Sequence, residues 1–277
     1  MIALVTDSNA LVPADLRSRF GVRVVPLTVV VDGQPYAEER ELSTAEFYDR
    51  LAAGATVSTA APSPGQFVVE YEQAAADGAN AVLSVHIGSN TSATVNSARL
   101  AAAASPIPVE IVDTGTASFP VGCCVWAAGS AIERGEDLAA AAAAASAVAA
   151  SIGNVFIVGG LDLARRGGRL APDAEGDEGI PVLALRAGTM DVVGRAHDIE
   201  GAIDAMADAV LAGAPGRALR VGVGDAVATG VADGLAARLS DAAAVRQIVR
   251  YQVGPSVAAH SGLGTAGAVY FPAELAG

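Results

Sequence analysis

The stretch His260-Ser-Gly-Leu-Gly-Thr-Ala-Gly-Ala-Val-Tyr-Phe271 decides which kind of α/β fold this sequence specifies. Gly262, Gly264 and Gly267 match the spacing G-x-G-x-x-G, which indicates a dinucleotide site only where a strand precedes the glycines and a helix follows them. Here the residues after the last glycine predict a strand that ends at Pro272, not a helix. The pattern therefore argues against a dinucleotide-binding fold, and the glycines and His260 need another role.

The composition predicts a folded, acidic protein. Its 277 residues are 52% hydrophobic, which is enough for one large domain or two modest ones, each with its own core. The 30 acidic side chains outnumber the 17 basic ones, so the formal charge is −13 and nucleic acid is a poor partner. All the basic residues are arginine, which excludes a Walker-type phosphate lysine and Schiff-base chemistry.

The cysteines and histidines provide few possible ligands for a metal ion. Cys123 and Cys124 are adjacent within an apolar run, which predicts reduced core residues and not a zinc site. Because only His86, His197 and His260 remain, we expect no metal, and we expect no other cofactor. The first residues lack a basic region, and no uncharged stretch reaches the roughly 18 apolar residues of a membrane span. We therefore expect a cytoplasmic protein without stable membrane insertion.

Short apolar runs alternate with helical segments in the first half of the sequence, the pattern of parallel strands joined by crossover helices. The predicted strands are Ile2 to Val5, Val22 to Val31 with a break at Pro26, Ala81 to Val85, and Val109 to Val112. The predicted helices are Pro13 to Phe20, Glu46 to Ala53, Gly65 to Ala76, Thr94 to Ala104, Pro120 to Arg134, and a last one capped by Asp137 that runs to about Ala150. Asp32-Gly33 predicts a turn.

The second half is richer in strands, so we place a domain boundary near residue 152 and expect two α/β domains, 1–152 and 153–277. A strand region begins at Asn154, and further strands are predicted at Pro181 to Arg186, Asp191 to Arg195, Leu219 to Val223, Val245 to Val253 and Gly267 to Phe271. Helices are predicted at Ile199 to Ala212 and Val227 to Leu239. The hairpin turn Arg186-Ala-Gly-Thr189 indicates that part of this sheet is antiparallel.

Four polar stretches follow a predicted strand or precede a predicted helix. They are Thr6 to Ser8, Ser58 to Pro64, Gly88 to Thr94, and Asp113 to Ser118. Ligands of α/β sheets bind at the carboxyl ends of the strands, and the N–H groups at helix N-termini favour an anion there. Each stretch alone is more simply interpreted as a helix cap or a turn. The four together favour a binding site.

Three histidines compete for a place in that site. His260 has only small neighbours and lies on no helical stripe, so a ligand could approach it, but a hydrogen-bonded core histidine is an equally good interpretation. His86 follows a predicted strand directly and is a second candidate. His197 stands in a predicted surface turn and carries little weight.

Six motifs, in order along nearly the whole chain, resemble those of the DegV family of fatty-acid-binding proteins. Thr6-Asp7-Ser8 resembles T-D-S, Thr59-Ala-Ala-Pro62-Ser63-Pro64-Gly-Gln-Phe67 resembles T-S-Q-P-S-P-x-x-F, Ser89-Asn-Thr-Ser92-Ala-Thr94-Val-Asn-Ser97-Ala98 resembles S-x-L-S-G-T-Y-Q-S-A, Asp113 to Ser118 resembles D-S-x-x-x-S, Arg166-Gly167-Gly168-Arg169-Leu170 resembles K-G-G-R-I, and His260-Ser-Gly262-Leu-Gly264 resembles H-T-G-P-G.

The resemblance implies a two-domain α/β protein, with a mostly parallel N-terminal domain, a mixed-sheet C-terminal domain, and a tunnel between them that holds one fatty acid. By position, Thr59, Ser92 and His260 would bind the carboxylate, with Ser89, Gly262 and Gly264 as secondary candidates. The implied role is not that of an enzyme but of the subunit that presents the acyl group to a fatty acid kinase, in the supply of phospholipid precursors.

Arg169 would face that kinase, although three arginines around two glycines also suit a solvated turn. The sequence departs from the family at Ala60, Ala61, Ala93 and Leu263, and its acidic loop 171–179 is shorter than usual. The four substitutions make the surroundings of the head group less polar, and the short acidic loop leaves ligand entry and chain-length preference open.

Two other functions stay open. One is an acyl hydrolase or transferase that uses Ser92 or Ser89 as nucleophile and His260 as base, although no G-x-S-x-G elbow is present. The other is nucleotide binding, which the missing lysines and the misplaced glycines disfavour.

Overall fold

The computed structural model describes residues 1–166, 168 and 179–276. The chain forms two compact units, Met1–Ala150 together with the residues from Leu275 onward, and Ser151–Glu274. This division lies close to the predicted boundary at residue 152, and the two domains 1–152 and 153–277 stay a prediction.

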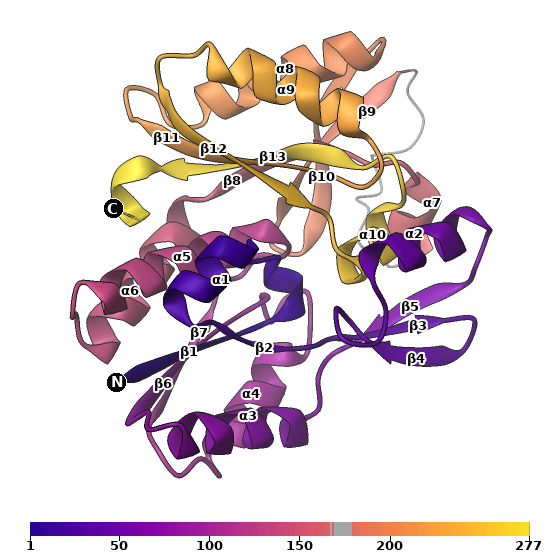
Figure 1. Ribbon diagram of the computed structural model, residues 1–277. Helices are drawn as coiled ribbons and strands as arrows, with labels where there is room; N and C mark the ends of the chain where they lie inside the picture. The colour runs from indigo at the N-terminus through magenta and orange to yellow at the C-terminus, as the bar shows by residue number, and fades with distance from the viewer. Residues whose placement is uncertain (167, 169–178, 277) are drawn as a thin grey trace. The chain divides into compact units, whose positions relative to one another are not determined.

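The first unit is built on a four-stranded parallel sheet in the order β2-β1-β6-β7 (Figure 1). The strands are β1 (Ile2–Asp7), β2 (Arg23–Val25), β6 (Ala81–His86) and β7 (Val109–Asp113). Helices α3 (Pro64–Ala76) and α4 (Thr94–Ala102) cover one face, and α1 (Ala14–Phe20) and α5 (Phe119–Glu133) lie on the other, followed by α6 (Leu138–Ser151). This confirms the predicted parallel α/β organisation of the N-terminal half.

Helix α5 is buried on all sides over most of its length, which agrees with its uncharged sequence. Gly122 lets it approach the carbonyl of Ala10, since a methyl group at that position would overlap the carbonyl oxygen. Cys123 and Cys124 lie within this buried stretch as free thiols, as expected. Burial raises the pKa of Cys124 to about 12 and that of Cys123 well above its usual value, so both thiols are unreactive core residues.

A second, three-stranded antiparallel sheet in the order β4-β3-β5 belongs to the same unit. It contains β3 (Thr28–Val31), β4 (Gln34–Ala37) and β5 (Val57–Ala60), and helix α2 (Thr44–Ala52) follows β4. The predicted turn Asp32-Gly33 joins β3 to β4, with both residues at positive φ, as a two-residue hairpin requires. β4 and β5 were not predicted, because both are short and β4 contains Pro35.

The second unit holds a six-stranded mixed sheet in the order β10-β9-β8-β13-β11-β12. Its strands are β8 (Gly153–Ile157), β9 (Ile180–Arg186), β10 (Thr189–Ala196), β11 (Leu219–Asp225), β12 (Val245–Gln252) and β13 (Ala266–Pro272). β11 pairs with β12 in parallel, while β9 and β10 form the predicted antiparallel hairpin. Helices α8 (Ile199–Ala212) and α9 (Thr229–Ser240) pack side by side on one face and enclose the core (Figure 1).

Two short helices of this unit were not predicted. They are α7 (Leu161–Arg166) and α10 (Pro255–Ser261). Each has fewer than eight residues, too few to show a helical repeat of apolar side chains. His260 therefore lies near the end of a helix, although no helix was predicted there.

Candidate functional site

The parallel sheet has its topological switch point between β1 and β6. From β1 the chain crosses to β2 on one side, and from β6 it crosses to β7 on the other, so the loops after these neighbouring strands diverge. Ligands of open α/β sheets bind in the crevice that such loops leave at the carboxyl ends of the strands. The polar stretches Thr6 to Ser8 and Gly88 to Thr94 begin at these two strand ends.

Hydrogen bonds at this edge join two of the four predicted polar stretches to each other and to the residue that adjoins a third. The Ser89 N–H donates to Asp113 Oδ1 over 3.0 Å, and the Gly88 N–H donates to the Thr116 carbonyl over 2.7 Å. The Ser118 N–H donates to the side chain of Asn9, which follows directly on the first stretch, over 2.6 Å. Segments far apart in the sequence thus form one polar edge, and the binding of a ligand there stays a prediction.

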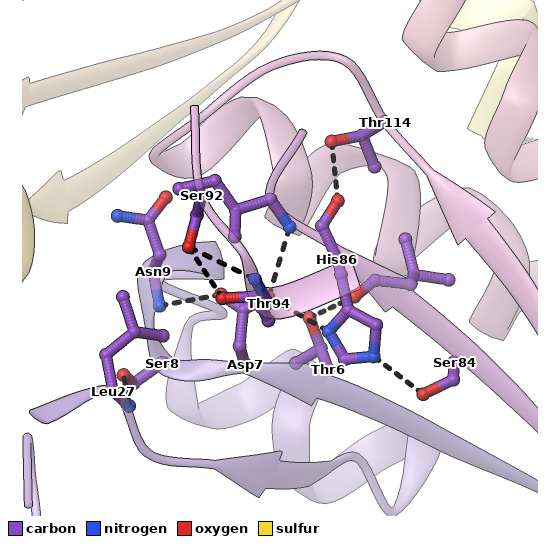
Figure 2. Close-up of polar contacts among 12 residues, drawn as sticks. Thr6, Asp7, Ser8, Asn9, Leu27, Ser84, His86, Ser92, Thr94 and Thr114 are labelled. Atoms are coloured by element: carbon purple, nitrogen blue, oxygen red, sulfur yellow. Dashed lines mark hydrogen bonds and ion pairs between the residues drawn. The ribbon is translucent and has the colours of Figure 1, made fainter. Parts of the chain in front are cut away.

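Ser92 lies in the loop before α4 and forms a hydroxyl pair with Thr94 (Figure 2). Their side-chain oxygens are 2.8 Å apart, and the Thr94 N–H donates to Ser92 Oγ over 3.3 Å. Thr94 is buried, whereas Ser92 is half-buried. The pair is therefore held by the start of the helix and keeps partial access to solvent on the Ser92 side.

A buried chain of polar side chains runs beneath the same edge, and Figure 2 shows three of its members, Asp7, His86 and Ser84. His86 Nδ1 lies 2.9 Å from Asp7 Oδ2, His86 Nε2 lies 2.6 Å from Ser84 Oγ, and Ser84 Oγ lies 2.9 Å from the hydroxyl of Tyr71. All four side chains have 0% exposure. Burial also raises the pKa of Tyr71 to about 12, against a smaller opposing effect of its bond to Ser84.

Ser84, His86 and Asp7 stand in the order of a serine hydrolase triad, but they do not form a usable one. A nucleophile must reach a substrate, and the hydroxyl of Ser84 is enclosed and bonded to both Tyr71 and His86. His86 was a candidate from the sequence, whereas Ser84 and Tyr71 were not predicted. A signal was present, because Ser84 and His86 occupy alternate positions of an otherwise apolar strand and so share one face.

A second buried polar contact holds the loop after β1. Ser8 Oγ lies 2.5 Å from Glu38 Oε2 and accepts the Leu27 N–H over 2.9 Å. Ser8 and Glu38 are both buried. The contact ties the parallel sheet to the segment around the antiparallel one, and nothing in the sequence pattern around Glu38 indicated it.

The remaining polar stretch, Ser58 to Pro64, lies on other elements than these three, namely β5 and the start of α3. Thr59 is a half-buried residue of β5, paired in register with Val29 of β3. Ser63 caps α3, since its side chain accepts the Gln66 N–H and the Gln66 side chain accepts the Ser63 N–H. This stretch therefore serves as a strand followed by a helix cap.

The glycines after His260 are explained by close contact between two backbone segments of the second unit. Gly262 and Gly264 have φ of 80° and 92°, and a methyl group on Gly159 would overlap the carbonyl of Leu263. The Gly160 N–H donates to the Ser261 carbonyl over 3.2 Å. The G-x-G-x-x-G spacing thus reflects close packing of two loops and not a phosphate-binding turn.

His260 itself is half-buried near the end of α10, next to these loops. It belongs to the second unit, whereas Thr59, Ser89 and Ser92 belong to the first. Arg169 and most of the acidic loop lie outside the described residues.

A surface pocket of about 460 Å³ adjoins the polar edge of the first unit. Its lining residues come from the loops after β6 and β7 and from α6: Ser89, Asn90, Asp113, Thr114, Gly115, Ser146, Ala149 and Ala150. Partial burial raises the pKa of Asp113, but the hydrogen bonds from Ser89 and Gly115 and the charge of Arg99 outweigh it, so the net pKa is lowered. Asp113 is therefore an ionised carboxylate that is already bound to its own loops.

A metal-binding cluster and a membrane-spanning helix are both absent from the described residues. In this part of the chain no group of three or more histidine, cysteine, aspartate or glutamate side chains could hold a metal ion. Its helices include none with the length and apolar character needed to cross a membrane.

Fold and site together define a class: a two-unit α/β protein whose parallel sheet gathers hydroxyl-rich loops at a switch point. The DegV family model, described as that of an uncharacterised protein, matches residues 1–273. The chain belongs to the DegV family.

Relatives of known sequence support this membership. A DegV domain-containing protein of Streptomyces coelicolor is 38% identical over 169 residues, which are 61% of this chain and 60% of that protein. A DegV domain-containing protein of Deinococcus radiodurans is 34% identical over 212 residues, 75% of this chain and 74% of that protein.

Solved structures share the whole fold. A DegV family protein from Thermus thermophilus, described for its fatty acid binding, superposes with a TM-score of 0.91 at 33% identity and covers 98% of this chain and 99% of its own. A DegV lipid-binding protein from Thermotoga maritima gives a TM-score of 0.90 at 25% identity and covers 98% of each chain. The predicted fold class is confirmed.

Proposed function

We propose that this protein binds a long-chain fatty acid, with the tail in an apolar tunnel and the carboxylate in a network of hydroxyl and imidazole donors. The observation that carries the proposal is the likeness, along almost the whole chain and at 33% identity, to the fatty-acid-binding DegV protein of Thermus thermophilus. A carboxylate taken out of water without hydrogen-bond partners costs several kcal/mol, so a site for it needs donors such as these.

Ser92 is the donor whose surroundings support this role most clearly. A serine hydroxyl has one proton to donate and two lone pairs that accept. If Ser92 Oγ accepts both the N–H and the hydroxyl of Thr94, its own proton is left to point at a ligand. The start of α4 also favours an anion near this residue.

Thr59 and His260 complete the proposed head-group site on the strength of their motifs. Thr59 stands in the stretch that resembles T-S-Q-P-S-P-x-x-F, and His260 opens the stretch that resembles H-T-G-P-G. Ser89, Gly262 and Gly264 are proposed as secondary contributors.

The further step is presentation of the bound acyl group to a fatty acid kinase, which would form an acyl phosphate. The protein would then act as a substrate-presenting subunit and not as an enzyme in its own right. Arg169 is proposed to face the kinase, because a guanidinium suits both an acidic surface and a phosphoryl group. This step rests on the resemblance of the motifs.

The binding proposal is tested by displacement of a fluorescent fatty acid from the lipid-free protein. Palmitate should displace the probe, whereas methyl palmitate, which lacks the carboxylate, should do so much more weakly. Equal displacement by both compounds would contradict the proposed head-group site, and no binding of the probe or of palmitate would contradict fatty acid binding altogether.

A further inference from the structure

The buried chain from Tyr71 to Asp7 has a defined direction. Asp7 is a carboxylate and can only accept, so His86 Nδ1 carries the proton in the 2.9 Å bond between them. If Nε2 of His86 accepts the hydroxyl proton of Ser84, Ser84 in turn accepts the hydroxyl proton of Tyr71. In this arrangement each donor of the chain meets one acceptor.

Asp7 connects the chain to the backbone at the switch point. Besides His86, its carboxylate accepts the Ile87 N–H over 3.1 Å at Oδ2 and the Asn9 N–H over 3.1 Å at Oδ1. Ile87 is the first residue after β6, so the orientation of one carboxylate sets the start of both diverging loops.

The loop after β6 continues this connection to Ser92. The carbonyl of His86 accepts the hydroxyl of Thr114 over 2.8 Å, and the carbonyl of Gly88 accepts the Ser92 N–H over 3.0 Å. The position of the Ser92 hydroxyl is therefore linked, bond by bond, to the carboxylate that His86 holds.

We propose that His86 is a positioning residue of the fatty-acid site: its Nδ1 proton orients Asp7, and Asp7 sets the loop from Ile87 to Ala93 that carries Ser92. The inference rests on the proposed function for its ligand readout. Its structural content concerns the first unit alone and has separate readouts, namely the tautomer of His86 and the exchange of the loop amides.

A matched pair of variants tests the hydrogen bonds of the two imidazole nitrogens one at a time. In His86→Asn the side-chain amide reproduces the Nδ1 donor and loses the bond to Ser84, whereas in His86→Gln the amide reaches toward Ser84 and loses the bond to Asp7. Both remove the ring that packs edge-on against Phe67 with centroids 5.0 Å apart, so both carry a similar packing loss.

Hydrogen exchange and palmitate affinity are measured on both variants and on Tyr71→Phe, which removes only the far end of the chain. We expect the Ile87 and Ser92 amides to exchange at least about tenfold faster in His86→Gln than in His86→Asn, and palmitate to bind about tenfold more weakly, as for loss of a hydrogen bond to a charged group. Tyr71→Phe should resemble the wild type in both readouts.

Each outcome either supports or contradicts the positioning role of His86. Equal amide exchange in His86→Asn and His86→Gln overturns the positioning role whether or not any ligand binds. Faster exchange only in His86→Gln, together with a wild type that binds no palmitate, supports the positioning of the loop and contradicts the proposed function instead. If neither variant folds, ¹⁵N-histidine spectra of the wild type decide, because a His86 that carries no proton on Nδ1 would overturn the inference.

Discussion

Gly159 and Leu263 lie in backbone contact, so close that a methyl group on Gly159 would overlap the carbonyl oxygen of Leu263. Gly159→Ala should therefore force the two loops apart and lower the free energy of unfolding by at least about 3 kcal/mol. Gly160→Ala is the matched control, since its added methyl group would lie 3.6 Å from Leu163 Cδ1, an ordinary contact distance. Urea denaturation of both variants tests this, and equal stabilities would show that the loops yield easily.

The double variant Thr59→Ala, Ser92→Ala should lose its fatty acid and keep its fold. Each hydrogen bond to a charged group contributes about 1.5–3 kcal/mol, so the combined loss of affinity should be on the order of a hundredfold or more. Ser58→Ala, at the exposed neighbour of Thr59 on β5, should bind as the wild type does. Calorimetric titration with palmitate measures this, and undiminished affinity in the folded double variant would remove both residues from the proposed site.

His260→Ala should weaken palmitate binding with little effect on the melting temperature, because the side chain is half-buried near the end of a short helix. His197→Ala, at an exposed position, is the control and should change neither quantity. The opposite result for His260→Ala, a large drop in melting temperature with unchanged affinity, would identify His260 as a core residue.

Burial of Tyr71 should make stability fall at high pH. The pKa of Tyr71 is raised from 10.0 to about 12 in the folded protein. Below pH 10 both states keep the proton, and between the two values the unfolded state releases it more readily, so rising pH favours unfolding by up to about 1.4 kcal/mol per pH unit. Urea denaturation between about pH 9 and 11 should show a steeper decline for the wild type than for Tyr71→Phe, and parallel curves would rule out the shift.

Arg169→Ala should retain the fatty acid and support little acyl-phosphate formation with a cognate kinase. The expectation rests on the motif alone, because this residue lies outside the described part of the chain. Lipid occupancy and kinase-dependent turnover, measured on one preparation, test it, and normal turnover would reduce Arg169 to a surface residue.

The long helices and strands were predicted well, because burial requires a periodic pattern or an unbroken run of apolar residues in each. Ile199–Ala212 has the bounds that its amphipathic pattern indicates, and the apolar runs around Val82 and Val221 are central strands. The elements that it missed, β4, β5, α7 and α10, are too short to show a repeat. Their conformations depend on partners distant in the sequence.

The edge of the parallel sheet was predictable for a different reason. Parallel strands end at the same edge, so the polar stretches after β1, β6 and β7 had to collect there. The buried chain beneath them was not predicted, because the partner of His86 is Asp7, 79 residues away, and only the sheet register brings the two together. The roles of Thr59, Ser92 and His260 stay predictions.

The central claim, that this protein holds a fatty acid, is tested most directly by mass spectrometry of the purified protein under denaturing conditions. Denaturation releases the ligand, and comparison with a standard gives its amount per chain. The account predicts a long-chain fatty acid at close to one molecule per chain, and a much lower amount after delipidation that palmitate restores. A protein that carries no fatty acid and takes up none when palmitate is supplied would contradict the account.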